Sequence, residues 1–185
     1  MAKGQLDAVL GHIRRLAAVN KASDLTDCQL LAEFSTHQDQ TAFTALVRRH
    51  GPMVLGICRH VLHHLQDAED AFQATFLVLA RNAGSIRKPE ALASWLHGVA
   101  YRTAMNARKA AIRRRTHEGK AKTLPSPNPP WDIAWKEVQS ILDEEIERLP
   151  EKYRAPFVLC FWEGQSRAAA ARQLGLKEGT VWSRL

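Results

Sequence analysis

The sequence lacks the features that mark secreted, membrane-spanning and cysteine-rich proteins. Its only cysteines are Cys28, Cys58 and Cys160, which form no CxxC pair. An odd number of widely spaced cysteines indicates neither a disulfide framework nor a cysteine zinc site. No apolar run reaches the roughly 18–20 residues that span a bilayer, and the N-terminus has no signal-peptide core. We therefore expect a cytoplasmic protein with no membrane partner.

Motifs for catalysis are also lacking. The chain has no Gly-rich phosphate loop, no HExxH motif and no Ser-His-Asp order that outranks chance. His60, His63 and His64 lie beside Cys58, but only His60 and His64 share a helical face, and no second group of ligands is identifiable. We therefore expect no enzymatic activity, no metal and no cofactor. An enzyme built on this histidine cluster is the weak alternative, which metal analysis of purified protein would test.

Positive charge exceeds negative charge, and the excess points to an anionic partner. The formal net charge is +7 and the isoelectric point is near 9.7. A protein of this kind binds nucleic acid or an acidic membrane surface. Its 185 residues, of which 45% are hydrophobic, suffice for one domain or two small ones.

The spacing of apolar residues predicts an all-α protein with two small helical domains. No stretch shows the sustained period-2 alternation of strands bounded by hairpin signals. Residues 116–130 include four prolines, which remove backbone donors and disfavour helix in their predecessors, so a linker is expected there. The expected divisions are an N-terminal extension over 1–23, a helical domain over 24–117, a linker over 118–131 and a helix-turn-helix domain over 132–185. The extension is expected to hold a short helix from about Gln5 to Val19, to which we assign no function.

A long helix over residues 90–115 carries most of the predicted nucleic-acid contacts. Its core-facing stripe consists of Leu92, Leu96, Val99, Thr103, Ala107 and Ala110. Beside that stripe lie aromatic, amide and cationic side chains: Trp95, Tyr101, Arg102, Asn106, Arg108, Lys109, Arg113, Arg114 and Arg115. Rings among cations bind phosphates by charge and stack unpaired bases, which favours single-stranded nucleic acid over an intact duplex. The alternative is a solvated basic face, which the interleaved Trp95 and Tyr101 disfavour.

A preceding helix, expected near residues 66–83, has an acidic start. Its first turn is expected to hold Asp67, Glu69 and Asp70, where negative charge complements the helix dipole. An apolar face that includes Phe76 follows at helical spacing. The acidic turn together with Gln73 predicts a docking surface for a basic partner helix. By itself, however, this pattern is typical of an ordinary packed helix.

The C-terminal stretch EGQSRAAAARQLGLKEGTVWSRL has the spacing of a helix-turn-helix. Ser166 can cap a short helix that ends at Leu174, Gly175 allows the turn, and a second helix opens near residues 177–179. The second helix of this motif enters the major groove of duplex DNA. A helical hairpin without any DNA contact is the alternative.

Three segments, in this order, resemble bacterial RNA polymerase sigma factors of the extracytoplasmic-function (ECF) group within the sigma-70 family. DAEDAFQATF is similar to the helix that binds the polymerase core, and SWLHGVAYRTAMNARKAAIRRR to the segment that recognises and melts the minus-ten element. LPEKYRAPFVLCFWEGQS and LGLKEGTVWSRL are similar to the domain that reads the minus-thirty-five element. The positions that match the three motifs are Asp67, Asp70, Gln73 and Phe76; Trp95, Leu96 and Ala100; and Gly179, Thr180, Val181, Ser183 and Arg184.

The resemblance implies roles for individual residues, and these add to the roles inferred from the helical faces. The core-polymerase-binding residues are expected to be Asp67, Glu69, Asp70, Gln73 and Phe76. The expected DNA contacts are the aromatic, amide and cationic residues named above for the helix over residues 90–115, together with Thr180, Ser183 and Arg184.

The function implied is that of a dissociable initiation subunit without covalent chemistry. It would bind the RNA polymerase core and promoter DNA and capture the melted non-template strand, with an anti-sigma factor as a possible further partner. The runner-up is a helix-turn-helix regulator that acts without polymerase, and co-purification with core would separate the two. Because the chain stops at Leu185, barely two turns after Gly179, we expect a truncated fragment that binds its duplex element poorly.

Overall fold

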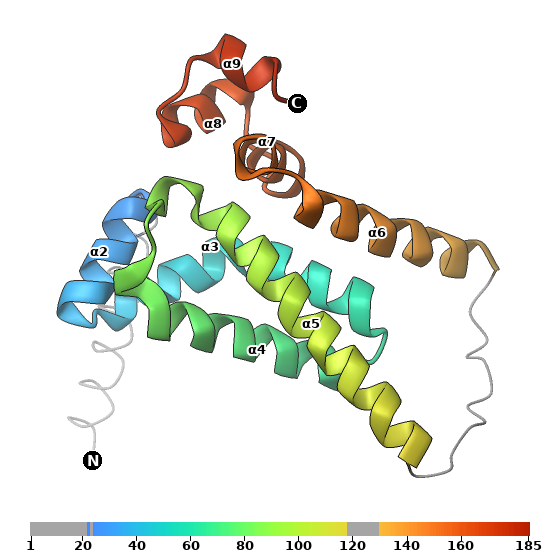
Figure 1. Ribbon diagram of the computed structural model, residues 1–185. Helices are drawn as coiled ribbons and strands as arrows, with labels where there is room; N and C mark the ends of the chain where they lie inside the picture. Colours follow the sequence, from blue (N-terminus) through green and yellow to red (C-terminus); the bar gives the residue numbers. More distant parts are fainter. Residues whose placement is uncertain (1–21, 23, 118–129) are drawn as a thin grey trace, which may run out of the picture.

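The described part of this computed structural model is helical throughout. It comprises residue 22 and residues 24–117 and 130–185, among which there is no strand, as the sequence predicted. Figure 1 shows the order α2 (Asp27–His37), α3 (Gln40–Leu62), α4 (Leu65–Asn82), α5 (Leu92–His117), α6 (Pro130–Arg148), α7 (Glu151–Phe157), α8 (Arg167–Leu174) and α9 (Glu178–Trp182). The expected helix over about 5–19 and most of the expected linker lie outside the described residues. No helix among the described residues is long and apolar enough to cross a membrane.

Local signals in the sequence fix the helix ends. Thr26 caps α2 in a capping box with Gln29, whose backbone N–H donates to the threonine hydroxyl at 3.3 Å. The Gln29 side chain in turn accepts from the Thr26 backbone N–H at 2.8 Å. Asp39 accepts from the Thr41 backbone N–H at 2.8 Å and starts α3. Each such cap satisfies a backbone donor that the helix itself leaves without a partner.

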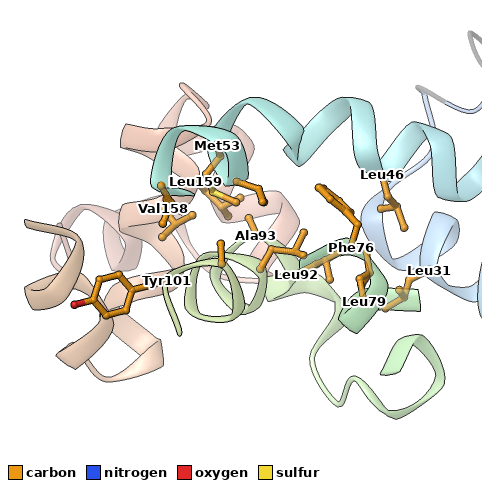
Figure 2. Close-up of a cluster of buried hydrophobic side chains, with 14 of the residues drawn as sticks. Leu31, Leu46, Met53, Phe76, Leu79, Leu92, Ala93, Tyr101, Val158 and Leu159 are labelled. Carbon is orange, nitrogen blue, oxygen red and sulfur yellow. The ribbon is translucent and has the colours of Figure 1, made fainter. Parts of the chain in front are cut away.

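Helices α3, α4 and α5 form the core of the first domain, with α2 packed beside them. Figure 2 shows a leucine from each of these helices in that core, Leu31, Leu46, Leu79 and Leu92. The fully buried side chains include Leu46 and Ile57 on α3, Leu79 on α4, and Leu92 and Leu96 on α5. Burial of each stabilises the fold by about 1.5–3 kcal/mol relative to an exposed side chain. The core stripe predicted for the first half of α5 is therefore confirmed.

The second domain shares this core instead of standing apart from it. Val158 and Leu159, in the π-helical turn Val158–Trp162 that follows α7, lie in the same buried cluster as Met53 of α3 (Figure 2). Among the side chains of α6 that the structure describes, Ile146 is the buried apolar one. Val138, Ile141 and Leu142 of the same helix and Leu149 just after it are exposed, because the face turned to α3 and α5 carries Asp143 and Ile146 instead.

Candidate nucleic-acid and polymerase interfaces

The exposed face of α5 is a row of cations. Arg102, Asn106, Arg108, Lys109, Arg113 and Arg114 are all exposed, whereas the side chain of Arg115 lies outside the described residues. These groups extend from the middle of α5 toward its C-terminus. A row of this kind attracts the phosphates of a nucleic-acid strand along its whole length.

Tyr101 corrects the sequence prediction, because it is a core residue and not part of the exposed row. Its exposed fraction is 8%, and Figure 2 shows its ring pointing away from the leucine cluster, toward the neighbouring ribbon. Burial is also the main cause that raises the pKa of its phenol, with Glu144 and Asp143 of α6 adding to the effect. The helical pattern of α5 could not show this, because the segment that covers Tyr101 comes from α6.

Trp95 lies half-buried against the core and lines a pocket of about 480 Å³. The rest of the wall comes mainly from the connection between α4 and α5, and the lining residues are Asn82, Ser85, Ile86, Arg87, Lys88, Trp95 and Glu151. A ring edged by two cations can stack a base and hold its phosphate. Sequence reasoning missed this pocket, although the Arg87-Lys88 pair next to a helix-breaking proline was a visible signal.

Helix α4 presents a mixed acidic and apolar surface. Glu69, Asp70 and Gln73 are exposed and Asp67 is partly exposed, but only Asp67 lies in the first turn because the helix begins at Leu65. Leu77, one turn after Gln73, is 59% exposed, and sequence reasoning missed it because it belongs to an apolar run. This surface can bind a partner by apolar contact flanked by negative charge.

Phe76 corrects the prediction for this helix. Its exposed fraction is 5%, and its ring packs edge-on against Phe72 at 5.0 Å and Phe43 at 6.4 Å between centroids. The aromatic cluster with α3 holds Phe76 inside the domain. It can therefore affect a partner only through the shape of α4.

The helix-turn-helix forms as the sequence predicted. Ser166 accepts from the Ala169 backbone N–H at 3.2 Å, and Gly175 adopts the left-handed conformation, with φ of 64°, that ends α8. Thr180 on α9 and Arg184 just after the helix are partly exposed, and Ser183, the residue that ends α9, is exposed. The indole of Trp182 is 67% exposed and lies under the Arg167 guanidinium at 4.5 Å, an outward pair that the sequence analysis did not single out.

Comparison with known proteins identifies the family. Profiles of the sigma-70 family match twice, sigma-70 region 2 over residues 46–116 and sigma-70 region 4 over residues 139–185. The ECF RNA polymerase sigma factor SigM of Mycobacterium tuberculosis is 36% identical over 160 residues, which cover 86% of this chain and 79% of SigM. The chain belongs to the ECF group of the sigma-70 family. This sigma factor is therefore a factor for transcription initiation by RNA polymerase.

Other known proteins are similar over nearly the same span. The RNA polymerase sigma-H factor of Pseudomonas aeruginosa is 29% identical over 168 residues, which cover 85% of this sigma factor and 87% of that protein. The structure of CnrH in complex with the cytosolic domain of CnrY is 22% identical, covers 86% of this chain and 89% of that one, and has a TM-score of 0.43. For brevity we call residues 24–117, which contain the region 2 match, the region 2 domain, and residues 130–185, which contain the region 4 match, the region 4 domain.

Acidic side chains of the region 4 domain contact cations of the region 2 domain. The Arg102 guanidinium on α5 donates to the Glu147 carboxylate on α6, and Arg154 on α7 donates to the same carboxylate at 3.0 Å. Lys88, at the pocket beside Trp95, lies 2.9 Å from Glu151. Two cations of this sigma factor's candidate DNA surface are therefore paired with its own second domain.

His50 is fully buried between carboxylates of both domains. Its Nε2 lies 3.2 Å from Asp27 on α2, and its Nδ1 lies 2.5 Å from Glu163, which follows α7. Burial by itself lowers the pKa of His50, but the two carboxylates outweigh it and raise that pKa to about 9. Burial raises the pKa of Asp27, but His50 and Arg49 more than offset this, so the net pKa lies below its usual range.

A second buried carboxylate, Asp143 on α6, also faces histidines of the region 2 domain. Asp143 lies 3.4 Å from the His60 ring and 3.8 Å from the His97 ring, and neither of its oxygens has a hydrogen bond from the described residues. His60 therefore faces α6 and does not share a helical face with His64. The His64 ring instead accepts a hydrogen bond from the Asp67 backbone N–H at the start of α4. The histidine cluster read from the sequence is thus divided between two different sites.

Proposed function

We propose that this sigma factor captures the melted non-template strand of promoter DNA in the pocket beside Trp95 and along the basic row of α5. The observation that carries the proposal is the placement of a half-buried indole in a pocket edged by Arg87 and Lys88, at the N-terminal end of a helix whose exposed face is cationic. An intact duplex offers no unstacked base to such a pocket, whereas a melted strand does.

The energies involved are of the right size for this role. Unstacking a base costs a few kcal/mol, and stacking on an aromatic side chain returns about 1–3 kcal/mol per base. Exposed cations such as Arg108 and Arg113 add attraction to the phosphates, which weakens as the salt concentration rises. Capture at Trp95 together with phosphate contacts along α5 can thus offset the cost of opening.

The remaining surfaces support the other steps of initiation. We propose that α4 binds the polymerase core through Asp67, Glu69, Asp70 and Gln73, with Leu77 as the apolar contact that the partner buries. We propose further that α9 contacts the duplex upstream through Thr180, Ser183 and Arg184. Val181 is fully buried and anchors α9 on the domain, so these neighbours are held at its surface.

Transcription with purified components tests the proposal. The sigma factor is added to purified core polymerase on genomic fragments, and run-off products are mapped together with permanganate reactivity of unpaired thymines. We expect discrete start sites, each with an open segment upstream. A regulator that acts without polymerase would bind DNA fragments yet neither co-purify with core nor open them, and that result would contradict the proposal.

A further inference from the structure

A buried histidine, His50, lies at the contact between the two domains. His50 is fully buried, and each of its ring nitrogens faces a carboxylate oxygen, Asp27 on one side and Glu163 on the other. A neutral imidazole has one N–H donor, so it would turn a lone pair toward one of the two carboxylates. Only the imidazolium presents an N–H and a positive charge to both, through a short hydrogen bond from Nδ1 to Glu163 and an ion-pair contact of Nε2 with Asp27 that lacks hydrogen-bond geometry.

The groups around His50 balance in charge only while it is protonated. Asp27 pairs with Arg49 of α3 at 2.6 Å, and the Gln173 amide on α8 donates to Asp27 at 3.2 Å. The formal charges of Asp27, Arg49, His50 and Glu163 sum to zero when His50 is a cation. Loss of its proton leaves a net negative charge at a site where the histidine is excluded from water, and such a charge is costly to bury.

The two sides of this arrangement come from different domains. Asp27, Arg49 and His50 belong to the region 2 domain and stay together when the domains separate, whereas Glu163 and Gln173 leave with the region 4 domain. Separation therefore removes one of the two carboxylates that favour the charged imidazole. Burial of the imidazole in the closed form acts in the opposite direction, but the net effect of the closed surroundings is a raised pKa of His50. We therefore expect the closed arrangement to bind this proton more tightly than the open one.

We propose that His50 and Glu163 form a proton-linked latch, which holds the region 4 domain against the region 2 domain while His50 is protonated and releases it as the pH rises. A second cluster joins the same two domains, because the buried Asp143 carboxylate of α6 lies 3.4 Å from the His60 ring and 3.8 Å from the His97 ring. The latch thus couples the separation of the two domains to the proton concentration.

The direction and range of the effect follow from linkage. A histidine whose pKa is raised in the closed state stabilises that state fully below the pKa that it has in the open state, and this stabilisation is lost as the pH rises toward about 9. A single linked proton changes the ratio of closed to open molecules by at most about tenfold per pH unit. The consequence for strand capture rests on the function proposed above. Opening would free Arg102 and Lys88 for phosphates, because in the closed form Arg102 pairs with Glu147 and Lys88 pairs with Glu151.

Small-angle X-ray scattering of the full chain across pH 6 to 9.5 tests the latch without any reference to DNA. We expect the radius of gyration of the wild-type protein to increase over this range at constant ionic strength. Glu163→Gln should be more open at pH 6 and should show a weaker pH dependence. The matched control is Glu151→Gln, which removes an interdomain carboxylate paired with a lysine and should keep the wild-type pH dependence.

Two results would overturn the latch. One is a wild-type radius of gyration that is the same at pH 6 and pH 9.5, a measurement that needs no variant to fold. The other is a Glu163→Gln protein, folded by circular dichroism, whose pH dependence equals that of the wild type. Normal pH-dependent opening without binding of single-stranded DNA would support the latch and count against the proposed strand capture, so the two failures are distinguishable.

Discussion

Lys88 and Glu151 pair across the domain boundary at 2.9 Å, on the wall of the pocket that Trp95 lines. The pairing of Arg102 with Glu147 repeats this relationship on α5. In both cases a carboxylate of the region 4 domain forms an ion pair with a cation that is a candidate phosphate contact. The protein's own second domain therefore stands where we propose that the DNA strand binds.

Removing these carboxylates should increase the affinity of the free protein for single-stranded DNA. For Glu147→Gln and Glu151→Gln together we expect a gain of up to about fivefold per exposed pair at low salt, since such pairs contribute at most about 1 kcal/mol. Fluorescence anisotropy with a labelled oligonucleotide measures this affinity. The control is Glu144→Gln, which removes the same charge from α6 but pairs with Arg148 of the same helix. An equal gain from Glu144→Gln would show that net charge alone is responsible.

Gly98→Ala should loosen the same contact without changing any charge. A Cβ atom at residue 98 would lie 2.8 Å from the Glu147 carboxylate and 2.9 Å from the Arg102 guanidinium, so these flexible side chains must shift. Gly56→Ala is the matched control because no atom lies within 4 Å of the added methyl group. Both changes should favour helix by roughly 0.5–1 kcal/mol. We expect only Gly98→Ala to raise the radius of gyration at pH 6, and identical scattering of the two variants would contradict this.

Trp95→Ala should impair promoter opening more than core binding. Loss of stacking worth about 1–3 kcal/mol corresponds to a five- to 150-fold weaker capture of one base. Permanganate footprinting with saturating holoenzyme measures opening, and Trp182→Ala controls for removal of an exposed indole elsewhere. Normal opening by a folded Trp95→Ala protein would assign the half-buried indole to packing alone.

Substitutions on the exposed face of α4 should weaken core binding without unfolding the domain. For Asp70→Lys, Gln73→Ala and Leu77→Ala we expect reduced affinity in a core pull-down titration and a change in stability below about 0.5 kcal/mol each. Phe76→Ala provides the contrast, because truncating a buried phenylalanine costs about 3–5 kcal/mol of unfolding free energy. Unchanged core affinity in all three surface variants would remove α4 as the binding element.

The sequence by itself determined the helical class, several of the helix ends and the family. Thr26, Asp39 and Ser166 accept from backbone N–H groups near the start of their helices, and Gly175 supplies a left-handed residue. These are local effects that act within one helical turn, so the residue type at one position is enough to reveal them. The order of the three segments that resemble sigma factors also indicated the function.

Only the tertiary structure decided which side chains remain available to a partner. Tyr101 and Phe76 lie on helices whose pattern permitted exposure, but α6 covers the first and an aromatic cluster with α3 encloses the second. The pairing of Glu147 with Arg102 and the burial of His50 against Glu163 likewise depend on segments far apart in the chain. Helical periodicity shows which face of a helix is apolar or charged. It does not show which distant segment covers that face, because burial is set by packing between elements and not by spacing within one of them.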